Sequence, residues 1–248
     1  MTRFLALFLA LGSAQAASLP SCFPQGGFKA GDAHAKSGRE LQLKSNDVLV
    51  LAGIDIPAAI EARTKARIDE VAAQGLRYVP LLSMPDRYGR IPADLAYGAE
   101  EKFLQGALVS EGYALAMPSG IRSVCIKDLL RLEKEARQEK AGLWAQPSDI
   151  ILQASDHQAL NEAQGQFRVI EGTILNVGKR DYATFLNFGT VFKHDFAVIV
   201  LKKNREAIDA VTPLAGLKGR QVLVRGILRP GTPPRLTLEN AESLEVLQ

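Results

Sequence analysis

The 248-residue sequence has little that would bind a transition metal, little excess charge and no long apolar run beyond its first residues. It contains two cysteines and three histidines, and His34, His157 and His194 are too scattered for the ligand spacing of a zinc site. The formal net charge of +3 is too small to argue for a nucleic-acid partner by itself. No stretch after the amino-terminal run is long enough to cross a bilayer.

The composition is that of a folded soluble protein. Hydrophobic residues make up 47% of the chain and charged residues 23%, which excludes wholesale disorder. There is no internal repeat and no low-complexity tract. Because domains commonly span roughly 100 to 200 residues, we expect two modest domains.

The first residues have the pattern of a signal peptide. Arg3 precedes the apolar run 4–11, and small residues end at Ala14-Gln15-Ala16. This pattern predicts a signal peptide over 1–16, cleaved before Ala17, and therefore a secreted or periplasmic protein. An uncleaved anchor is the alternative, although the run is far shorter than the roughly 20 residues that span a membrane.

Export bears on the two cysteines, Cys22 and Cys125. Outside the reducing cytosol they can form a disulfide, which would close a loop of about 100 residues and stabilise the fold by several kcal/mol. Two unpaired buried thiols are the alternative, because the sequence does not show that they come within bonding distance. A lipid anchor on Cys22 is disfavoured by Pro20, inside the segment that would be the lipobox.

Apolar periodicity and turn residues predict mixed structure in the first half. We expect a hairpin over 40–52, helices over 60–74, 100–111 and 124–141, and short strands over 78–82 and 95–97, with Trp144 packed in the core beneath the last helix. Residues 147–164 are polar and without an apolar stripe, and they are predicted to be a linker.

The second half is predicted to be mostly β. Short apolar runs occur at 167–175, 183–188, 196–201, 221–228, 236–238 and 244–246, with one helix near 204–210, which favours a small closed barrel over a parallel sheet. Residues 165–248 contain 12 Lys and Arg against 8 Asp and Glu, whereas residues 17–150 contain 17 of each. Any preference for a polyanion therefore belongs to the second half.

Three segments of the first half occur in an order typical of one family. They are Val50-Leu51-Ala52-Gly53-Ile54-Asp55-Ile56-Pro57, Asp86-Arg87-Tyr88-Gly89-Arg90, and 133–144 with its Gly142-Leu143-Trp144. Together they resemble the thermonuclease, or staphylococcal nuclease-like, family. The resemblance implies an α+β fold for 17–146, a five-stranded OB-type barrel with three helices. Residues 165–248 look like the small OB-like barrel appended in some bacterial members.

Active members hold a Ca²⁺ ion with two aspartates and a threonine carbonyl, activate water with a glutamate and stabilise the phosphate with two arginines. Carried over to this sequence, the first aspartate position falls on Arg39, one arginine on Val50, the threonine on Ile56 and the general base on Ala58. Asp55 is the remaining metal ligand and Arg90 the remaining catalytic arginine. A positive charge thus stands where the dication needs an acid.

This pattern predicts an exported protein with a degenerate nuclease site and little or no hydrolytic activity. We expect it to bind nucleic acid, possible ligands including single strands, or another polyanion. We expect no cofactor if the site is degenerate, and Ca²⁺ if nuclease activity is retained. One alternative is an active Ca²⁺-dependent phosphodiesterase in which Glu40 or Glu61 replaces the base. Another is an envelope scaffold that binds protein or glycan.

The remaining motif residues have two interpretations each. Arg87 and Tyr88 are candidates for binding phosphate and stacking on a base, or they form ordinary surface. Asp55 could instead cap the turn before Pro57. Arg90 could instead be a structural ion-pair partner of the helix that contains Glu133.

Overall fold

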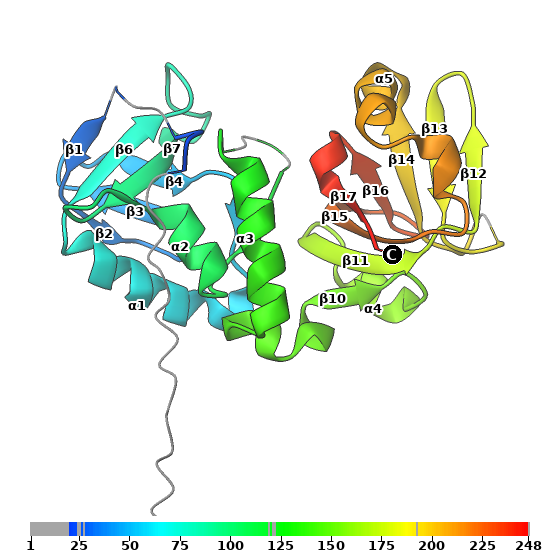
Figure 1. The fold of residues 1–248 in the computed structure, drawn as a ribbon, viewed down its shortest axis with the longest axis horizontal. Coiled ribbons are helices and arrows are strands. Elements are labelled where there is room, and N and C mark those ends of the chain that lie inside the picture. Colours follow the sequence, from blue (N-terminus) through cyan, green and yellow to red (C-terminus); the bar gives the residue numbers. More distant parts are fainter. Residues whose placement is uncertain are drawn as a thin grey trace, which may run out of the picture.

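The computed structural model describes residues 20–23, 26, 28–118, 120, 123–191 and 193–247. In these ranges the chain forms two β-sheet assemblies, and helix α3 (Ile126–Glu139) stands between them (Figure 1). The predicted signal peptide, 1–16, lies outside the described residues. A search of the described helices finds none with the length and hydropathy needed to span a membrane.

The first sheet is a nearly closed barrel. Its strands follow the order β1 (Lys29–Gly31), β6 (Leu76–Pro80), β7 (Arg90–Tyr97), β4 (Val48–Leu51), β3 (Glu40–Leu43) and β2 (Ala33–Ala35). Strands β1 and β2 are two pieces of one extended segment interrupted at Asp32. Because β1 pairs with β6 and β2 pairs with β3, this segment closes the ring. The five-stranded OB-type barrel is confirmed, with its first strand split in two.

Three helices accompany the barrel, as predicted: α1 (Glu61–Ala72), α2 (Leu104–Ser110) and α3. Each presents apolar side chains to the interior, where Ile68, Leu108 and Leu129 are at most 1% exposed. Helix α2 begins later than predicted, because β8 (Lys102–Phe103) pairs with β7 instead of joining the helix. The apolar stripe of the helix was visible in the sequence, but this extra pairing was not.

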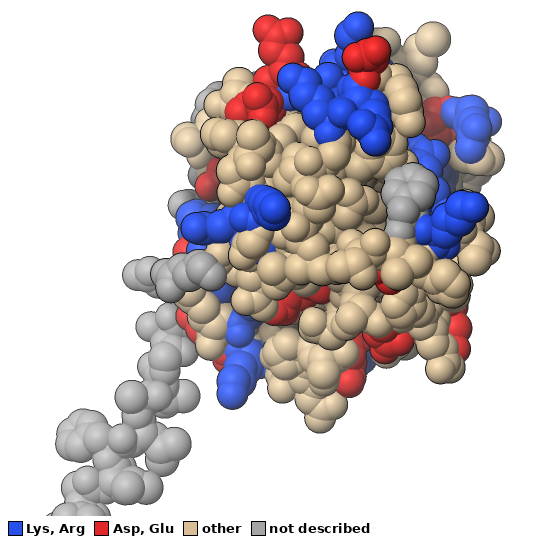
Figure 2. Space-filling view, turned by 90° about the vertical axis from the view of Figure 1, so that its right-hand side faces the viewer, with Lys and Arg blue, Asp and Glu red and all other residues tan. Residues whose placement is uncertain are grey.

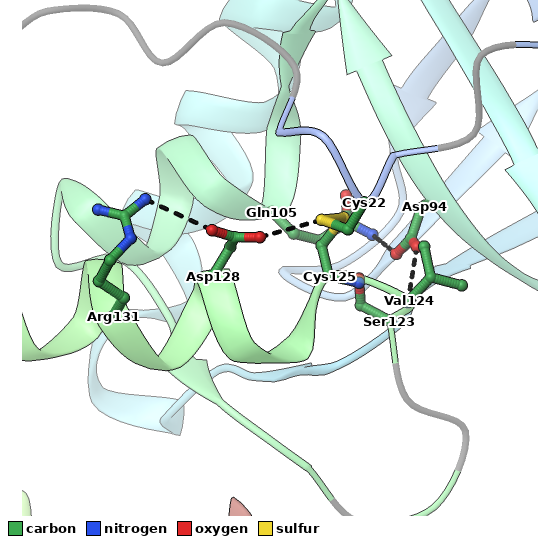
Figure 3. The surroundings of a disulfide bond; sticks show 8 residues. All are labelled: Cys22, Asp94, Gln105, Ser123, Val124, Cys125, Asp128 and Arg131. Carbon is green, nitrogen blue, oxygen red and sulfur yellow. Dashed lines mark hydrogen bonds and ion pairs between the residues drawn. A yellow bond between two sulfur atoms is a disulfide. The ribbon is translucent and has the colours of Figure 1, made fainter.

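A disulfide joins Cys22 to Cys125, 103 residues apart, with a Cα–Cα distance of 5.4 Å. It fastens the amino-terminal segment to the residue that precedes α3 (Figure 3). The neighbouring Phe23 is 1% exposed and contacts the ring of Phe103, with the centroids 5.3 Å apart. The two cysteines are therefore bonded, and the alternative of two free thiols does not apply.

The second sheet has the order β10 (Ile151–Gln153), β11 (Phe167–Thr173), β15 (Gln221–Arg229), β16 (Arg235–Leu238), β14 (Ala197–Leu201), β13 (Ala183–Asn187) and β12 (Asn176–Lys179), with β17 (Leu244–Val246) on β15. It curves around its own apolar core, which includes Ile170, Val198 and Leu236. Helix α5 (Lys202–Val211) packs on this core through Ile208. Strands β11 and β12 are two pieces of one extended segment interrupted at residues 174–175, and because β11 pairs with β15 and β12 pairs with β13, this segment closes the ring of the predicted small barrel.

The segment 147–164, predicted to be a linker, contains regular structure. A short 3-10 helix (Pro147–Asp149) leads into β10, which pairs in parallel with β11. Helix α4 (His157–Glu162) follows, and Leu160 is 1% exposed in the second core. Such short elements leave no apolar period to read in the sequence. The second sheet therefore starts at Ile151 rather than after residue 164.

The two halves share a third apolar cluster. Trp144 is fully buried in it, as predicted for a core residue, but its partners come from both halves of the chain. Leu115 and Ala136 come from the first half, and Phe167 and Leu223 come from the second. The interface is thus built like a core, and it fixes the second sheet against α3.

Candidate functional site

Asp55, which the sequence predicts to be the remaining metal ligand, is engaged by Arg39. Asp55 ends β5 (Ile54–Asp55), which pairs with β9 (Leu115–Ala116), and Arg39 immediately precedes β3. The Nη1 atom of Arg39 donates to Oδ1 of Asp55 over 2.9 Å, and the Asp55 side chain is only 14% exposed. The charges at the two positions predicted to correspond to the family's aspartate ligands therefore neutralise each other.

The electrostatics of Asp55 involve both halves of the chain. Burial raises the pKa of its carboxyl group, and the positive charges of Arg39 and Arg168 act in the opposite direction. Arg168 lies on β11 of the second sheet. The second half thus contributes a cation to the surroundings of this carboxylate.

Asp55 and Arg39 lie at a cleft of about 890 Å³ between the two halves. Ile56 and Ala58, which occupy the family's threonine and general-base positions, line the same cleft. The second sheet supplies the facing wall, including Ile227 and Arg229 of β15. The cleft is the place where the family's chemistry would occur, and neither Ile56 nor Ala58 brings a side-chain oxygen to it.

The charges around this cleft are balanced. Four arginines line it, Arg39, Arg168, Arg225 and Arg229, and so do four acids, Asp55, Asp149, Glu162 and Glu239. Most of its other lining residues are apolar or uncharged. A lining of zero net charge does not attract a polyanion over a distance.

Arg90, the other surviving catalytic position, is not beside Asp55. Its Nε and Nη2 atoms donate to Asp86 over 3.0 and 2.9 Å, and its Nη1 atom donates to Glu40 over 2.9 Å. Of the described residues that line the cleft, none is Arg90 or one of its partners Asp86 and Glu40. Arg90 is therefore separated from the cleft, and the alternative in which it pairs with the Glu133 helix does not apply, because its ion-pair partners are Asp86 and Glu40.

The turn before Arg90 is held by its first residue. The Asp86 carboxylate accepts the backbone N–H groups of Tyr88 and Arg90. The Tyr88 ring is 64% exposed and lies against two guanidinium groups, with the Cζ atoms of Arg87 and Arg90 at 4.7 and 4.9 Å from its centroid. These contacts satisfy the arginines locally, which favours a structural role for the turn.

The candidate substitute bases and Val50 also lie elsewhere. Glu40 binds Arg90 and lies 3.6 Å from the Nζ atom of Lys36. Glu61 accepts the backbone N–H of Gly38 at 3.4 Å. Val50 is opposite Glu40 in the β3–β4 ladder. Of the described residues that line the cleft, none is Glu40, Glu61 or Val50.

Within the described residues, three ion pairs that were not predicted from the sequence cross the interface, the longest of them between Lys134 of α3 and Glu245 of β17 at 3.7 Å. Arg225 of β15 binds Glu133 of α3 over 2.7 Å, and the two side chains are 2% and 0% exposed. Arg137 of α3 binds Glu245 of β17 over 2.6 Å. A charged residue inside the apolar run 222–226 was the available signal, since arginine is rarely buried without a partner.

The barrel, its three helices and the position of Asp55 together define a nuclease-type OB domain. A family model described as staphylococcal nuclease homologue matches residues 49–146, and this domain of the chain belongs to that family. All three motifs of the resemblance fall inside the matched residues, whereas Arg39 and Glu40 precede them. Among curated proteins, none matches the chain.

Members of this family depend on Ca²⁺ in general, and the residues around Asp55 do not suit that ion. Calcium takes about six to eight oxygen ligands. Here Asp55 already accepts a hydrogen bond from Arg39, Ala58 has no side-chain oxygen, and Ile56 can offer only its main-chain carbonyl. A guanidinium cannot be deprotonated to make room for a dication.

Proposed function

We propose that this protein is an exported member of the nuclease family that binds nucleic acid and has little or no hydrolytic activity. The observation that carries the proposal is the 2.9 Å contact between Arg39 and Asp55. It replaces calcium–carboxylate chemistry by an internal ion pair. Loss of the general base or of a phosphate-stabilising group commonly costs about 10² or more in rate, so the combined loss leaves little hydrolysis.

An active Ca²⁺-dependent enzyme would need a base near Asp55. Glu40 is committed to Arg90, and Glu61 bonds to the backbone of Gly38. Rearranging Glu40 would leave Arg90 with one carboxylate partner, Asp86, and Glu40 is not among the residues that line the cleft. These contacts favour the binding function over the catalytic one.

Export is supported by two independent features. The first residues have the pattern of a signal peptide, and Cys22 and Cys125 are joined by a disulfide. Structural disulfides persist in the periplasm and outside the cell and are rare in a reducing cytosol. We therefore assign the mature protein to one of these oxidising compartments.

Digestion and binding assays test this proposal together. Purified protein is incubated with plasmid and single-stranded DNA, with Ca²⁺ or with a chelator, beside an Asp55→Asn control. We expect no Ca²⁺-dependent cleavage above the control, together with salt-sensitive retention of single-stranded DNA in chelator. Brisk cleavage that needs Asp55 would contradict the degenerate site. Failure to retain DNA even at low salt would favour the scaffold alternative.

A further inference from the structure

Four neighbouring cations of the second half differ from several arginines of the first half in having no acid of the described residues in contact with them. In the first half, Arg67, Arg77, Arg90 and Arg131 are all held in ion pairs with carboxylates. In the second half, exposed cations occur at Lys179, Arg180, Lys202 and Lys203. Within the described part of the chain, these four form no ion pair. Their charge therefore faces solvent without compensation from a contacting acid.

The fold brings these cations together from two segments. Strand β12 ends at Lys179 and β13 begins at Ala183, which is opposite Leu201, the residue before α5. The backbone N–H of Lys202 donates to the carbonyl of Tyr182 over 2.9 Å. The Nη2 atom of Arg205 donates to the carbonyl of Arg180 over 2.6 Å. The β12–β13 turn and the first turn of α5 are thus held side by side.

The position of the lysines on α5 increases the positive potential. Lys202 and Lys203 are the first two residues of the helix, where the helix dipole already places partial positive charge. Cations at this end reduce helix stability, so the arrangement is not explained by folding. It concentrates an attraction for anions at one edge of the second sheet.

An exposed aromatic residue lies among these cations. Tyr182 is 66% exposed and meets Phe185 edge to face, with the ring centroids 6.0 Å apart. Across the β12–β13 ladder, Gly178 is opposite Phe185. A Cβ placed on Gly178 would meet only Asn187 Nδ2, at 3.9 Å, within ordinary contact distance. The hairpin therefore has open space beside an aromatic face.

We propose that single-stranded nucleic acid binds at this hairpin surface, formed by Lys179, Arg180, Tyr182, Lys202, Lys203 and Arg205. The cations contact phosphates, and the Tyr182 ring stacks on a base, a combination that suits single strands. Two acids, Asp181 and Glu206, lie in the same segments, which leaves the surface with a net charge of +3. Figure 2 looks at this side of the molecule and shows Lys and Arg near the top, where Figure 1 places α5, with Asp and Glu side chains beside them.

The interdomain cleft is the weaker candidate for this ligand. Its four arginines are balanced by four acids, and Arg225 is committed to Glu133. The hairpin surface has excess positive charge and an exposed ring, and the cleft has neither. The inference rests on the proposed binding function and specifies where that function is located.

Fluorescence anisotropy with labelled oligothymidylate of about 20 nucleotides tests the assignment, since single-strand sites on such barrels span about 4–16 nucleotides. The double charge reversal K179E/R180E is expected to weaken binding at least about tenfold at roughly 0.1 M salt and to flatten the slope of log affinity against log salt by about 1.4. The control R63E/K127E changes the net charge equally, at exposed cations of the first half. It is expected to change the affinity less than about threefold.

Tyr182→Ala separates base stacking from simple charge attraction. It is expected to weaken oligothymidylate binding about tenfold and to leave binding of an abasic strand of the same charge unchanged, while Tyr182→Phe retains the affinity for oligothymidylate. If the wild type fails to bind oligothymidylate at low salt, the proposed function itself is lost. If the wild type binds but K179E/R180E binds equally well, only the hairpin surface is wrong. Equal binding of the abasic strand, insensitive to Tyr182, would assign the surface to a polyanion without bases and overturn the single-strand inference.

Discussion

Arg225 and Glu133 meet in the interior of the interface, with Nη1 of the arginine 2.7 Å from Oε1 of the glutamate. Both side chains also bind the backbone of Ala116. The Ala116 N–H donates to Glu133 at 2.7 Å, and the Ala116 carbonyl accepts from Arg225 at 3.2 Å. Helix α3, strand β9 and strand β15 therefore converge on a single buried charge pair. This contact fixes how the second sheet stands over the cleft.

Arg225→Met should destabilise the protein strongly. The substitution leaves the Glu133 carboxylate buried without a cation, which typically costs about 3–5 kcal/mol. Urea unfolding followed by circular dichroism measures the change in the free energy of unfolding. Arg220→Met, at an exposed arginine beside β15, is the control and should change the free energy of unfolding by less than about 0.5 kcal/mol.

The double variant R225M/E133Q distinguishes a lost charge pair from lost packing. A glutamine at 133 carries no charge and still has an oxygen for the Ala116 N–H, so much of the stability should return. A double variant as unstable as the single one would show that the cost comes from packing, and the role given to the ion pair would be wrong.

Asp94 predicts a pH dependence of stability between about pH 4 and 6. It is fully buried, and burial raises its pKa to about 6 from the ordinary 3.8, although Ser123 and the Val124 N–H oppose this shift. The folded state therefore binds this proton more tightly than the unfolded state. The contribution of Asp94 to the free energy of unfolding falls as pH rises through this window, by about 3 kcal/mol, and is constant above it.

Asp94→Asn is the matched variant, because its amide keeps an acceptor for Val124 and does not titrate there. Urea unfolding at several pH values should show the stability difference between variant and wild type moving in favour of the variant as pH rises from about 4 to 6. Curves that stay parallel across the window would mean that Asp94 has an ordinary pKa.

The disulfide should contribute substantially to stability. A bridge across 103 residues restricts the unfolded chain by about 4–5 kcal/mol in the chain-entropy description. Reduction of the wild type should therefore strongly lower the urea concentration at the midpoint of unfolding. The variant C22S/C125S should unfold at a similarly low urea concentration. The double serine variant serves as the control, since its midpoint must not respond to reductant. An unchanged wild-type midpoint after complete reduction would refute this contribution.

Arg90 is expected to act on stability rather than on nucleic-acid binding. Its guanidinium group is held by Asp86 and Glu40, so Arg90→Ala should cost about 1 kcal/mol of stability. The affinity for oligothymidylate should stay unchanged. Arg87→Ala, at the neighbouring arginine whose guanidinium group lies over the Tyr88 ring, should cost less. A marked loss of affinity in Arg90→Ala would restore its role as a phosphate ligand.

The sequence predicted what depends on local pattern. The β3–β4 hairpin follows from two apolar runs around a polar turn, where Asn46 adopts a left-handed conformation with φ of 70°. The long amphipathic helix α3 was equally visible. Strand β12 was missed because its four residues, Asn176–Lys179, carry one large apolar side chain and no alternation that indicates burial.

The site was harder to predict from the sequence than the fold, because most of its contacts join residues that are far apart in the chain. The residue types at positions 39 and 55 indicated an altered site, but their direct pairing depends on how β3 and β5 meet. Arg90 is bound by Asp86, four residues away, and by Glu40, 50 residues away, and the partner of Glu133 is 92 residues away, at Arg225. Sequence spacing alone cannot choose between such partners, since the choice is made by which strands and helices come to lie together.

Calorimetric titration of the purified, disulfide-bonded protein with Ca²⁺ tests the central claim most directly, because Arg39 and calcium compete for the same carboxylate. The account predicts no saturable binding at Asp55, so that wild type and Asp55→Asn give the same titration. Stoichiometric Ca²⁺ binding by the wild type that disappears in Asp55→Asn would contradict it.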